Sequence, residues 1–146
     1  MVEKAEIHAL NEWLKGQYMG LHAYDHFIEK LKDESVKHEF QRIHQELKEQ
    51  AGEIADRIRQ LGGEPVTSEG ILGAVQSYIA SWRVAPRSDE IIKKALEGEQ
   101  LGIEMTEKTV RGELSASSLA LARRILDEDR RHVETLQRLL IQPVGG

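Results

Sequence analysis

Cysteine is absent from this chain of 146 residues, which excludes disulfide bonds, thiolate metal ligands and redox-active thiol pairs. Proline occurs only 3 times and aromatic residues make up 5% of the chain, whereas glutamate, lysine, leucine, isoleucine and alanine are frequent. This composition favours helix along nearly the whole sequence. Because 40% of the residues are hydrophobic, the chain length predicts a single domain, residues 1–146, with one core.

The sequence also lacks a block of basic residues and a long apolar run. The 20 Lys and Arg residues are scattered among 25 Asp and Glu residues, and the net charge of −5 argues against nucleic acid or a membrane surface as a partner. The first residues, Met1 to Glu6, lack the apolar core of a signal peptide, so we expect a cytoplasmic protein. No nucleophile–base pair, phosphate loop or nucleotide motif points to an enzyme class, and enzymatic activity stays open.

Hydrophobic periodicity predicts four long helices. Apolar residues recur at alternating steps of three and four, which is the period of an amphipathic helix. The predicted helices span about residues 4–32, 34–62, 88–112 and 116–141. Short junctions join the first helix to the second and the third to the fourth, so each pair is expected to form an antiparallel hairpin.

Local signals mark where these helices begin and end. Asp33 and Ser88 precede helical stretches and are predicted to cap the second and third helices. Gly62 and Gly63, followed by Pro65, are predicted to end the second helix, because glycine adopts the left-handed backbone that closes a helix.

The segment between the hairpins, residues 64–87, is far longer than a bundle loop needs. It contains an amphipathic stretch whose apolar members are Ile71, Leu72, Val75, Tyr78, Ile79 and Trp82. We therefore predict a short helix inside a long crossover that runs along the outside of the bundle. Short–long–short connections distinguish this all-α architecture from a plain up-and-down bundle.

The two hairpins repeat each other at an offset of 82 residues, so that Leu14 aligns with Leu96 and Arg42 with Arg124. Both helices of the hairpin keep register without a gap. A repeat of this length predicts two hairpins related by an approximate two-fold axis.

Glycine pairs recur in this repeat, in the first and third helices; they are Gly16, Gly20, Gly98 and Gly102. Each glycine lowers helix stability by roughly 1 kcal/mol. We expect close approach of a neighbouring helix to offset this cost, and a functional backbone site is the alternative.

Five polar residues interrupt the apolar stripes at the middle of the helices: Gln17, Gln50, Glu99, Asp129 and His132. A buried carboxylate costs several kcal/mol unless it is paired, hydrogen-bonded or bound to metal. Asp129 and His132 are three residues apart on one helix, so their side chains share a face and can share a ligand. The spacing therefore predicts that these side chains meet around one point.

The Leu-x-Gly-Glu-x-x-Gly phrase from Leu96 to Gly102 and the Asp129-Arg-Arg-His132 pair resemble the di-iron pattern of ferritin-like proteins. In that pattern two helices each supply a Glu, and the other two each supply a carboxylate-x-x-His pair. With the crossover, the resemblance covers nearly the whole chain, and it looks closest to small bacterial ferritin-like proteins of unknown function, with rubrerythrin and bacterioferritin as better-understood relatives. It implies a ferritin-like antiparallel four-helix bundle in which Glu99, Asp129 and His132 are iron ligands.

The other half of such a site is replaced. At the offset of 82, Gln17 stands for Glu99, and the positions that match Asp129 and His132 hold Leu47 and Gln50. Leucine cannot bind iron, and carboxamides are poor substitutes for carboxylate and imidazole. The sequence therefore predicts a degenerate di-iron site.

Two interpretations of the remaining half stay open. In one, Glu99, Asp129 and His132 hold a single ion of iron, manganese or zinc, with Gln17 and water completing the shell. In the other, no metal binds, the amides of Gln17 and Gln50 bond the two acids, and the histidine pairs with a carboxylate.

These interpretations lead to different functions. The first hypothesis is a non-catalytic binding, structural or stress-associated module, expected as a homodimer with an unknown protein partner. The alternative is a metalloprotein that handles oxygen or peroxide through Glu99, Asp129 and His132. Two further residues lie near the stripes: His44 is an outside candidate for the site, and Glu46 is expected to form a surface salt bridge.

Overall fold

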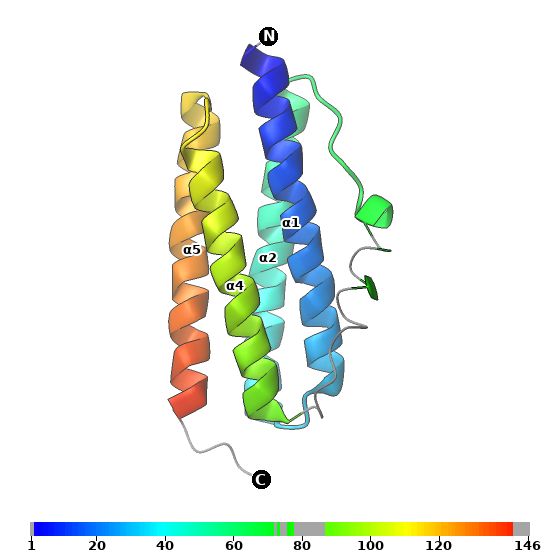
Figure 1. Cartoon of the computed structure of the whole chain (residues 1–146), viewed down its shortest axis with the longest axis vertical. Coiled ribbons are helices and arrows are strands. Elements are labelled where there is room, and N and C mark those ends of the chain that lie inside the picture. Colours follow the sequence, from blue (N-terminus) through cyan, green and yellow to red (C-terminus); the bar gives the residue numbers. More distant parts are fainter. Residues whose placement is uncertain (1, 72, 74–75, 78–86, 142–146) are drawn as a thin grey trace.

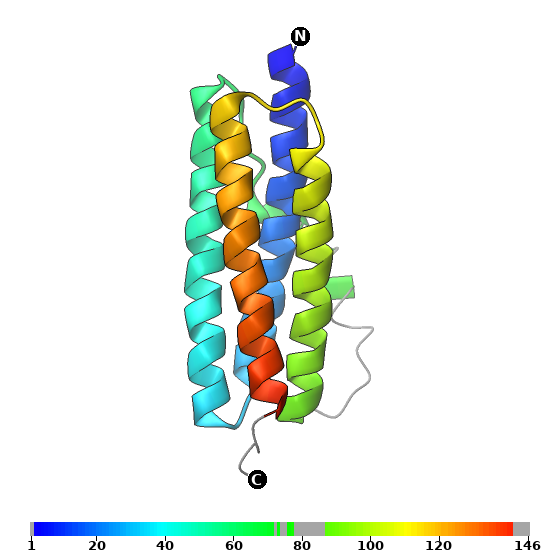
Figure 2. The ribbon, with the colours of Figure 1, turned by 90° about the vertical axis from the view of Figure 1, so that its left-hand side faces the viewer.

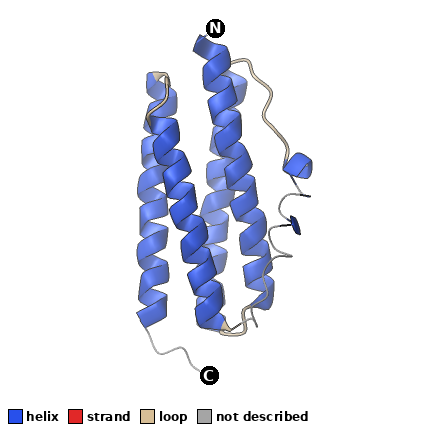
Figure 3. Ribbon diagram, viewed as in Figure 1, coloured by secondary structure: helices blue, strands red, loops and turns tan. Residues whose placement is uncertain are grey.

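The computed structural model describes residues 2–71, 73, 76–77 and 87–141. The elements with defined bounds among these residues are four long helices and one short 3₁₀ helix: α1 (Val2–Lys30), α2 (Glu34–Gln60), η1 (Ser68–Ile71), α4 (Ser88–Val110) and α5 (Ala116–Ile141). The described residues form no strand, which confirms the all-α prediction (Figure 3). Within those residues, no helix combines the length and the apolarity that crossing a membrane requires.

The helices form two antiparallel hairpins, α1 with α2 and α4 with α5 (Figure 1). The chain leaves α2 at the end of the bundle where α1 begins and returns to the opposite end before α4 starts, so a long crossover joins the hairpins. Its described part includes η1, which contacts α1. Figure 2 shows α5 lying between α2 and α4. Most of the predicted crossover helix, from Leu72 to Trp82, lies outside the described residues.

One of the two predicted N-terminal caps is present. The carboxylate Oδ1 of Asp33 accepts hydrogen bonds from the backbone N–H groups of Ser35, at 3.0 Å, and Val36, at 3.1 Å, and so caps α2. The prediction for Ser88 is wrong by one residue, because Arg87 has the extended backbone of the cap position and Ser88 is already helical. Arg87 makes no side-chain cap hydrogen bond, so α4 begins without one.

The end of α2 confirms the predicted glycine stop. Gly62 has a φ of 85°, and the N–H of Gly63 donates to the carbonyl oxygen of Ile58 at 2.9 Å. This is a Schellman closure, which requires a left-handed residue that only glycine adopts without strain. Gly63 is also tightly enclosed, because a Cβ atom there would lie 2.7 Å from Cγ2 of Ile7.

Two apolar clusters fill the bundle, one toward each end. One includes Phe27 and Phe40 near the α1–α2 turn, and the other includes the buried Trp13. In chain order the predicted polar residues fall between members of the two clusters, as Gln50 does between Leu47 and Ala51. The candidate site is thus a polar layer between two half-cores.

The start of α5 is held by a buried charge that the periodicity did not reveal. Glu6 is buried, and its carboxylate accepts hydrogen bonds from the backbone N–H of Ser115, at 3.0 Å, and from the hydroxyls of Ser115 and Ser118. Burial acts to raise the pKa of Glu6, but these bonds and the nearby Arg57 outweigh it and lower the pKa. The anion at a helix N-terminus also matches the helix dipole.

Candidate metal centre

The structure brings together the three acidic and imidazole residues predicted for the site. Glu99 extends from α4, and Asp129 and His132 extend from adjacent turns of α5; their exposed fractions are 5%, 2% and 3%. The Nδ1 atom of His132 lies 3.5 Å from Oε1 of Glu99 and 3.6 Å from Oδ1 of Asp129. One ligand atom from each residue lies within 4.8 Å of the others, so the group can hold a metal ion.

His132 is the unusual member of this group, because both its ring nitrogens are buried and neither has a hydrogen-bond partner among the residues that the structure describes. Its Nε2 atom lies 3.6 Å from Oε1 of Glu46. Buried polar atoms in proteins are nearly always hydrogen-bonded, so an imidazole with two unpartnered nitrogens requires an explanation. Ligand atoms bound tetrahedrally to one ion at about 2.1 Å lie about 3.4 Å apart. The spacing around Nδ1 is close to that value.

The glutamines satisfy the metal-free interpretation only in part. The amide nitrogen of Gln50 donates to Oδ1 of Asp129 at 3.3 Å and to Oε1 of Glu128 at 2.9 Å. The amide nitrogen of Gln17, however, donates to the side-chain oxygen of Gln50 at 2.9 Å and not to Glu99. One acid therefore receives the expected amide and the other does not.

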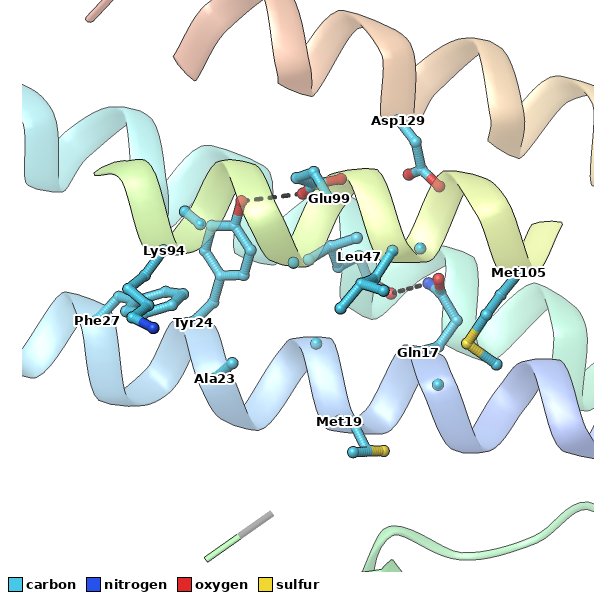
Figure 4. Close-up of a pocket in the computed structure, with 16 residues that line it drawn as sticks. Gln17, Met19, Ala23, Tyr24, Phe27, Leu47, Lys94, Glu99, Met105 and Asp129 are labelled. Carbon is cyan, nitrogen blue, oxygen red and sulfur yellow. Dashed lines mark hydrogen bonds between the residues drawn. The ribbon is translucent and has the colours of Figure 1, made fainter. Parts of the chain in front are cut away.

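Tyr24 is a site residue that the sequence did not single out. Its hydroxyl donates to Oε1 of Glu99 at 2.9 Å (Figure 4), and burial together with the Glu99 charge raises its pKa well above the usual range. The available signal was its position seven residues after Gln17, which places both on the same face of α1.

The buried carboxyl groups make the centre strongly attractive to a cation. Burial, and then the charge of Glu99, raise the pKa of Asp129 to about 7, although His132 and the Gln50 amide partly oppose this. Burial acts to lower the pKa of His132, but the carboxylates of Glu99, Asp129 and Glu46 outweigh it and raise the pKa. A divalent cation would relieve the repulsion between the acids and replace the proton that Asp129 retains.

Comparison with known protein families matches residues 5–112 to the family described as "Domain of unknown function (DUF2383)". The chain belongs to the DUF2383 family. The matched residues of this DUF2383 chain include Gln17 and Glu99 but end before α5, which carries Asp129 and His132. No curated protein sequence matches the chain.

Solved structures similar to the DUF2383 chain have ferritin-like folds. The dodecameric thioferritin of Bacteroides fragilis, a bacterioferritin-related protein, has a TM-score of 0.80 at 22% identity, over 94% of this chain and 85% of that one. Dps1 of Mycobacterium smegmatis has a TM-score of 0.82 at 16% identity, over 95% and 97%. A protein of Anabaena variabilis with DJ-1/ThiJ/PfpI-like and ferritin-like domains has a TM-score of 0.84 at 19% identity, over 98% of this chain and 43% of that one. These likenesses confirm the ferritin-like fold.

Two neighbours of the centre differ from their predicted roles. The Nε2 atom of His44 lies 2.8 Å from Oδ1 of the exposed Asp25, so His44 pairs at the surface and does not join the metal-ligand group. Glu46 was expected in a surface salt bridge, but its carboxylate instead approaches His132. The centre of this DUF2383 chain is therefore flanked by one carboxylate that remains partly open to solvent.

The repeated glycines do not pack as predicted. At Gly16 a Cβ atom would lie 3.0 Å from Cε of Met105, so there the neighbouring helix is close. At Gly20, Gly98 and Gly102 nothing lies within 4 Å of such an atom. Close helix approach therefore explains one of the four positions, and the other three border open space.

That space is a cavity of about 170 Å³ between α1 and α4 (Figure 4). All four repeated glycines line it, together with apolar side chains that include Met19, Ala23, Phe27, Leu101 and Met105. The polar side chains that line it include Gln17, Glu99 and Asp129. The cavity therefore leads from an apolar surface to the candidate metal centre.

Proposed function

We propose that this chain is a ferritin-like metal-binding protein that holds one divalent transition-metal ion at Glu99, Asp129 and His132. The observation that carries the proposal is the buried imidazole of His132, whose two ring nitrogens have no hydrogen-bond partner in the described part of the chain. Its Nδ1 atom lies 3.5 and 3.6 Å from two buried carboxylates, close to the spacing of ligands around one ion. Metal would satisfy the nitrogen and neutralise the paired acids.

The donor set supports a single ion without selecting one element. One nitrogen and two carboxylate ligands suit iron, manganese or zinc. Gln17 remains a proposed fourth ligand. Its amide N–H donates a hydrogen bond to the side-chain oxygen of Gln50, so its own carbonyl oxygen would be the ligand atom. Leu47 occupies the position of a carboxylate in the other half, which argues against a second ion. A bound ion would act there as a Lewis acid or a redox centre.

The competing function is a metal-free module whose role lies in protein contacts or stress protection. The hydrogen bonds from Gln17 to Gln50 and from Gln50 to Asp129 favour it. The contacts of His132 with the carboxylates of Glu46, Glu99 and Asp129, at 3.5 to 3.6 Å, favour it as well. Neither ring nitrogen has a hydrogen-bond partner among the described residues, however, so we prefer the metal-binding function. Chemistry on oxygen or peroxide would be a consequence of iron at this centre and depends on the first proposal.

Metal analysis separates the two functions. The protein is purified without chelator, its metal content is measured, and after EDTA treatment it is titrated with Co(II) or Fe(II). We expect one ion per chain in the wild type and at least a tenfold loss of affinity in His132→Ala. His38→Ala removes an exposed histidine that lies off the centre and serves as the matched control. No binding at sub-millimolar metal, or equal binding in both variants, would reject the proposal.

We further propose that the protein self-associates, as the homodimer predicted from sequence. The Bacteroides fragilis thioferritin is described as dodecameric, which supports assembly in a ferritin-like bundle without fixing the number of subunits here. Sedimentation equilibrium measures the mass directly, and a monomer at all accessible concentrations would contradict this proposal.

A further inference from the structure

The cavity between α1 and α4 is kept open by residues that gain nothing from packing. Gly20, Gly98 and Gly102 lie inside helices, where glycine is unfavourable, yet no neighbouring atom occupies the place of their missing Cβ atoms. The large apolar side chains at the rim are also left uncovered, since Leu101 is 55% exposed and Met19 is 38% exposed. The glycines beside these apolar side chains therefore leave space that larger side chains would fill.

Two buried carboxylates face this space from inside. Glu99 and Asp129 line the cavity although 5% or less of each residue is exposed. Tyr24 bonds only Oε1 of Glu99, and Gln50 bonds only Oδ1 of Asp129. The second oxygen of each carboxylate, Oε2 and Oδ2, has no hydrogen-bond partner among the described residues. The apolar cavity therefore ends at two carboxylate oxygen atoms that can each accept a hydrogen bond from a ligand.

From this combination we propose that the cavity binds a small organic ammonium ion with an apolar body of about six carbon atoms. The volume of the cavity supports an apolar body of this size, because an apolar protein cavity of about 150 Å³ accommodates benzene and this one has about 170 Å³. The charge of the two carboxylates supports an ammonium head, because an ammonium group donates hydrogen bonds to carboxylates and an anionic head would be repelled by them. Lys94, a cation that also lines the cavity, is paired with Glu97, whose Oε2 atom lies 3.7 Å from its Nζ atom. Methionine at the rim adapts its shape to different apolar groups.

Binding of an organic ammonium ion does not require the proposed metal site, but it would compete with metal binding. An ammonium head and a divalent ion would both use the carboxylates of Glu99 and Asp129, so the two ligands should exclude each other. The organic cation would therefore occupy the metal-free protein.

Ligand binding to metal-free protein in EDTA tests the proposal with three probes that share one body: n-hexylamine, 1-hexanol and hexanoate. At pH 7.5, calorimetry should show hexylamine binding at least tenfold more tightly than hexanol, and hexanoate not binding. Glu99→Gln should lower hexylamine affinity at least tenfold and leave hexanol affinity unchanged. Equal binding of hexylamine and hexanol would overturn the cationic class, and absence of hexylamine binding would overturn the proposal.

A filled cavity provides the second test. Gly102→Leu places a side chain where space is free, and Gly52→Leu makes the same change on α2, away from the cavity. Only Gly102→Leu should abolish hexylamine binding, while both variants fold and bind Co(II) as the wild type does. Hexylamine should also weaken Co(II) binding in proportion to its concentration. Cobalt binding without any hexylamine binding would reject this inference alone. If the wild type binds no amine and Gly102→Leu loses the dimer that the wild type forms, the occupant of the cavity is a second copy of this chain and the proposal is wrong.

Discussion

Replacing Asp129 by Asn should stabilise the metal-free protein at alkaline pH, although it removes a side chain from the centre. Folding raises the pKa of Asp129 from an ordinary value near 3.8 to about 7, because burial and Glu99 disfavour its charge. The folded protein therefore holds a proton that the unfolded chain releases, and stability falls as pH rises from about 4 to about 7. The loss is complete above the raised pKa.

The magnitude follows from the size of this shift. A shift of about three pKa units in Asp129 corresponds to roughly 4 kcal/mol at pH 8, as an upper limit. Asn keeps an oxygen that can accept the Gln50 hydrogen bond and carries no charge, but it loses the attraction to His132. We expect a gain of about 2 kcal/mol at pH 8, or a rise in Tm of roughly 4–8 °C, and little change near pH 4.5.

Urea and thermal unfolding in EDTA at pH 4.5, 6 and 8 measure this effect. Asp127→Asn, on an exposed position of the same helix, is the matched control and should show no such dependence. With saturating Co(II) the order should reverse, because only the wild type gains stability from the ion. If Asp129→Asn is destabilised equally at all three pH values, charge repulsion does not govern this centre and our account of its electrostatics is wrong.

Three further outcomes follow from the same centre and from the start of α5. Metal affinity should fall as pH drops below about 7, because protons compete for Asp129, and Co(II) titrations at pH 6 and 8 measure the change. Restoring the second half-site with Gln17→Glu, Leu47→Glu and Gln50→His together should raise the stoichiometry to two ions; one ion would contradict the repeat alignment. Glu6→Gln should destabilise the fold by roughly 1–3 kcal/mol in urea unfolding at pH 7, because hydroxyl and amide donors lose a charged acceptor. The wild type should lose this advantage as pH falls through the lowered pKa of that group, and an unchanged midpoint would show the contact to be dispensable.

The four helices and the ligand group were predictable because both depend on residue spacing. An apolar stripe of period 3.6 identifies a helix, and a polar residue on that stripe must lie in the core. Glu99, Asp129 and His132 satisfy this condition and are buried together. The repeat offset likewise located their replaced counterparts without any structural information.

Features that depend on contacts between helices were not predictable. The repeat located the glycines, but whether a second helix covers Gly98 depends on the separation of α1 and α4. The residue pattern of a single helix carries no information about that separation. The burial of Glu6 depends on the turn before α5, which is distant in sequence. The cap of α4 failed for a different reason, since Ser88 has the favoured residue type but the backbone turns one residue earlier.

The polar layer between the two half-cores also determines how the helices align along their length. Sliding α5 by one turn, about 5.4 Å, toward its C-terminal end would move Asp129 toward the apolar cluster that contains Leu136 and bring the apolar Ile125 to the level of Glu99. A carboxyl group without partners in such surroundings costs several kcal/mol, whereas two continuous apolar stripes would slide with little penalty. The residues that form the candidate centre therefore also select one register of the bundle, and they would do so before any ion binds.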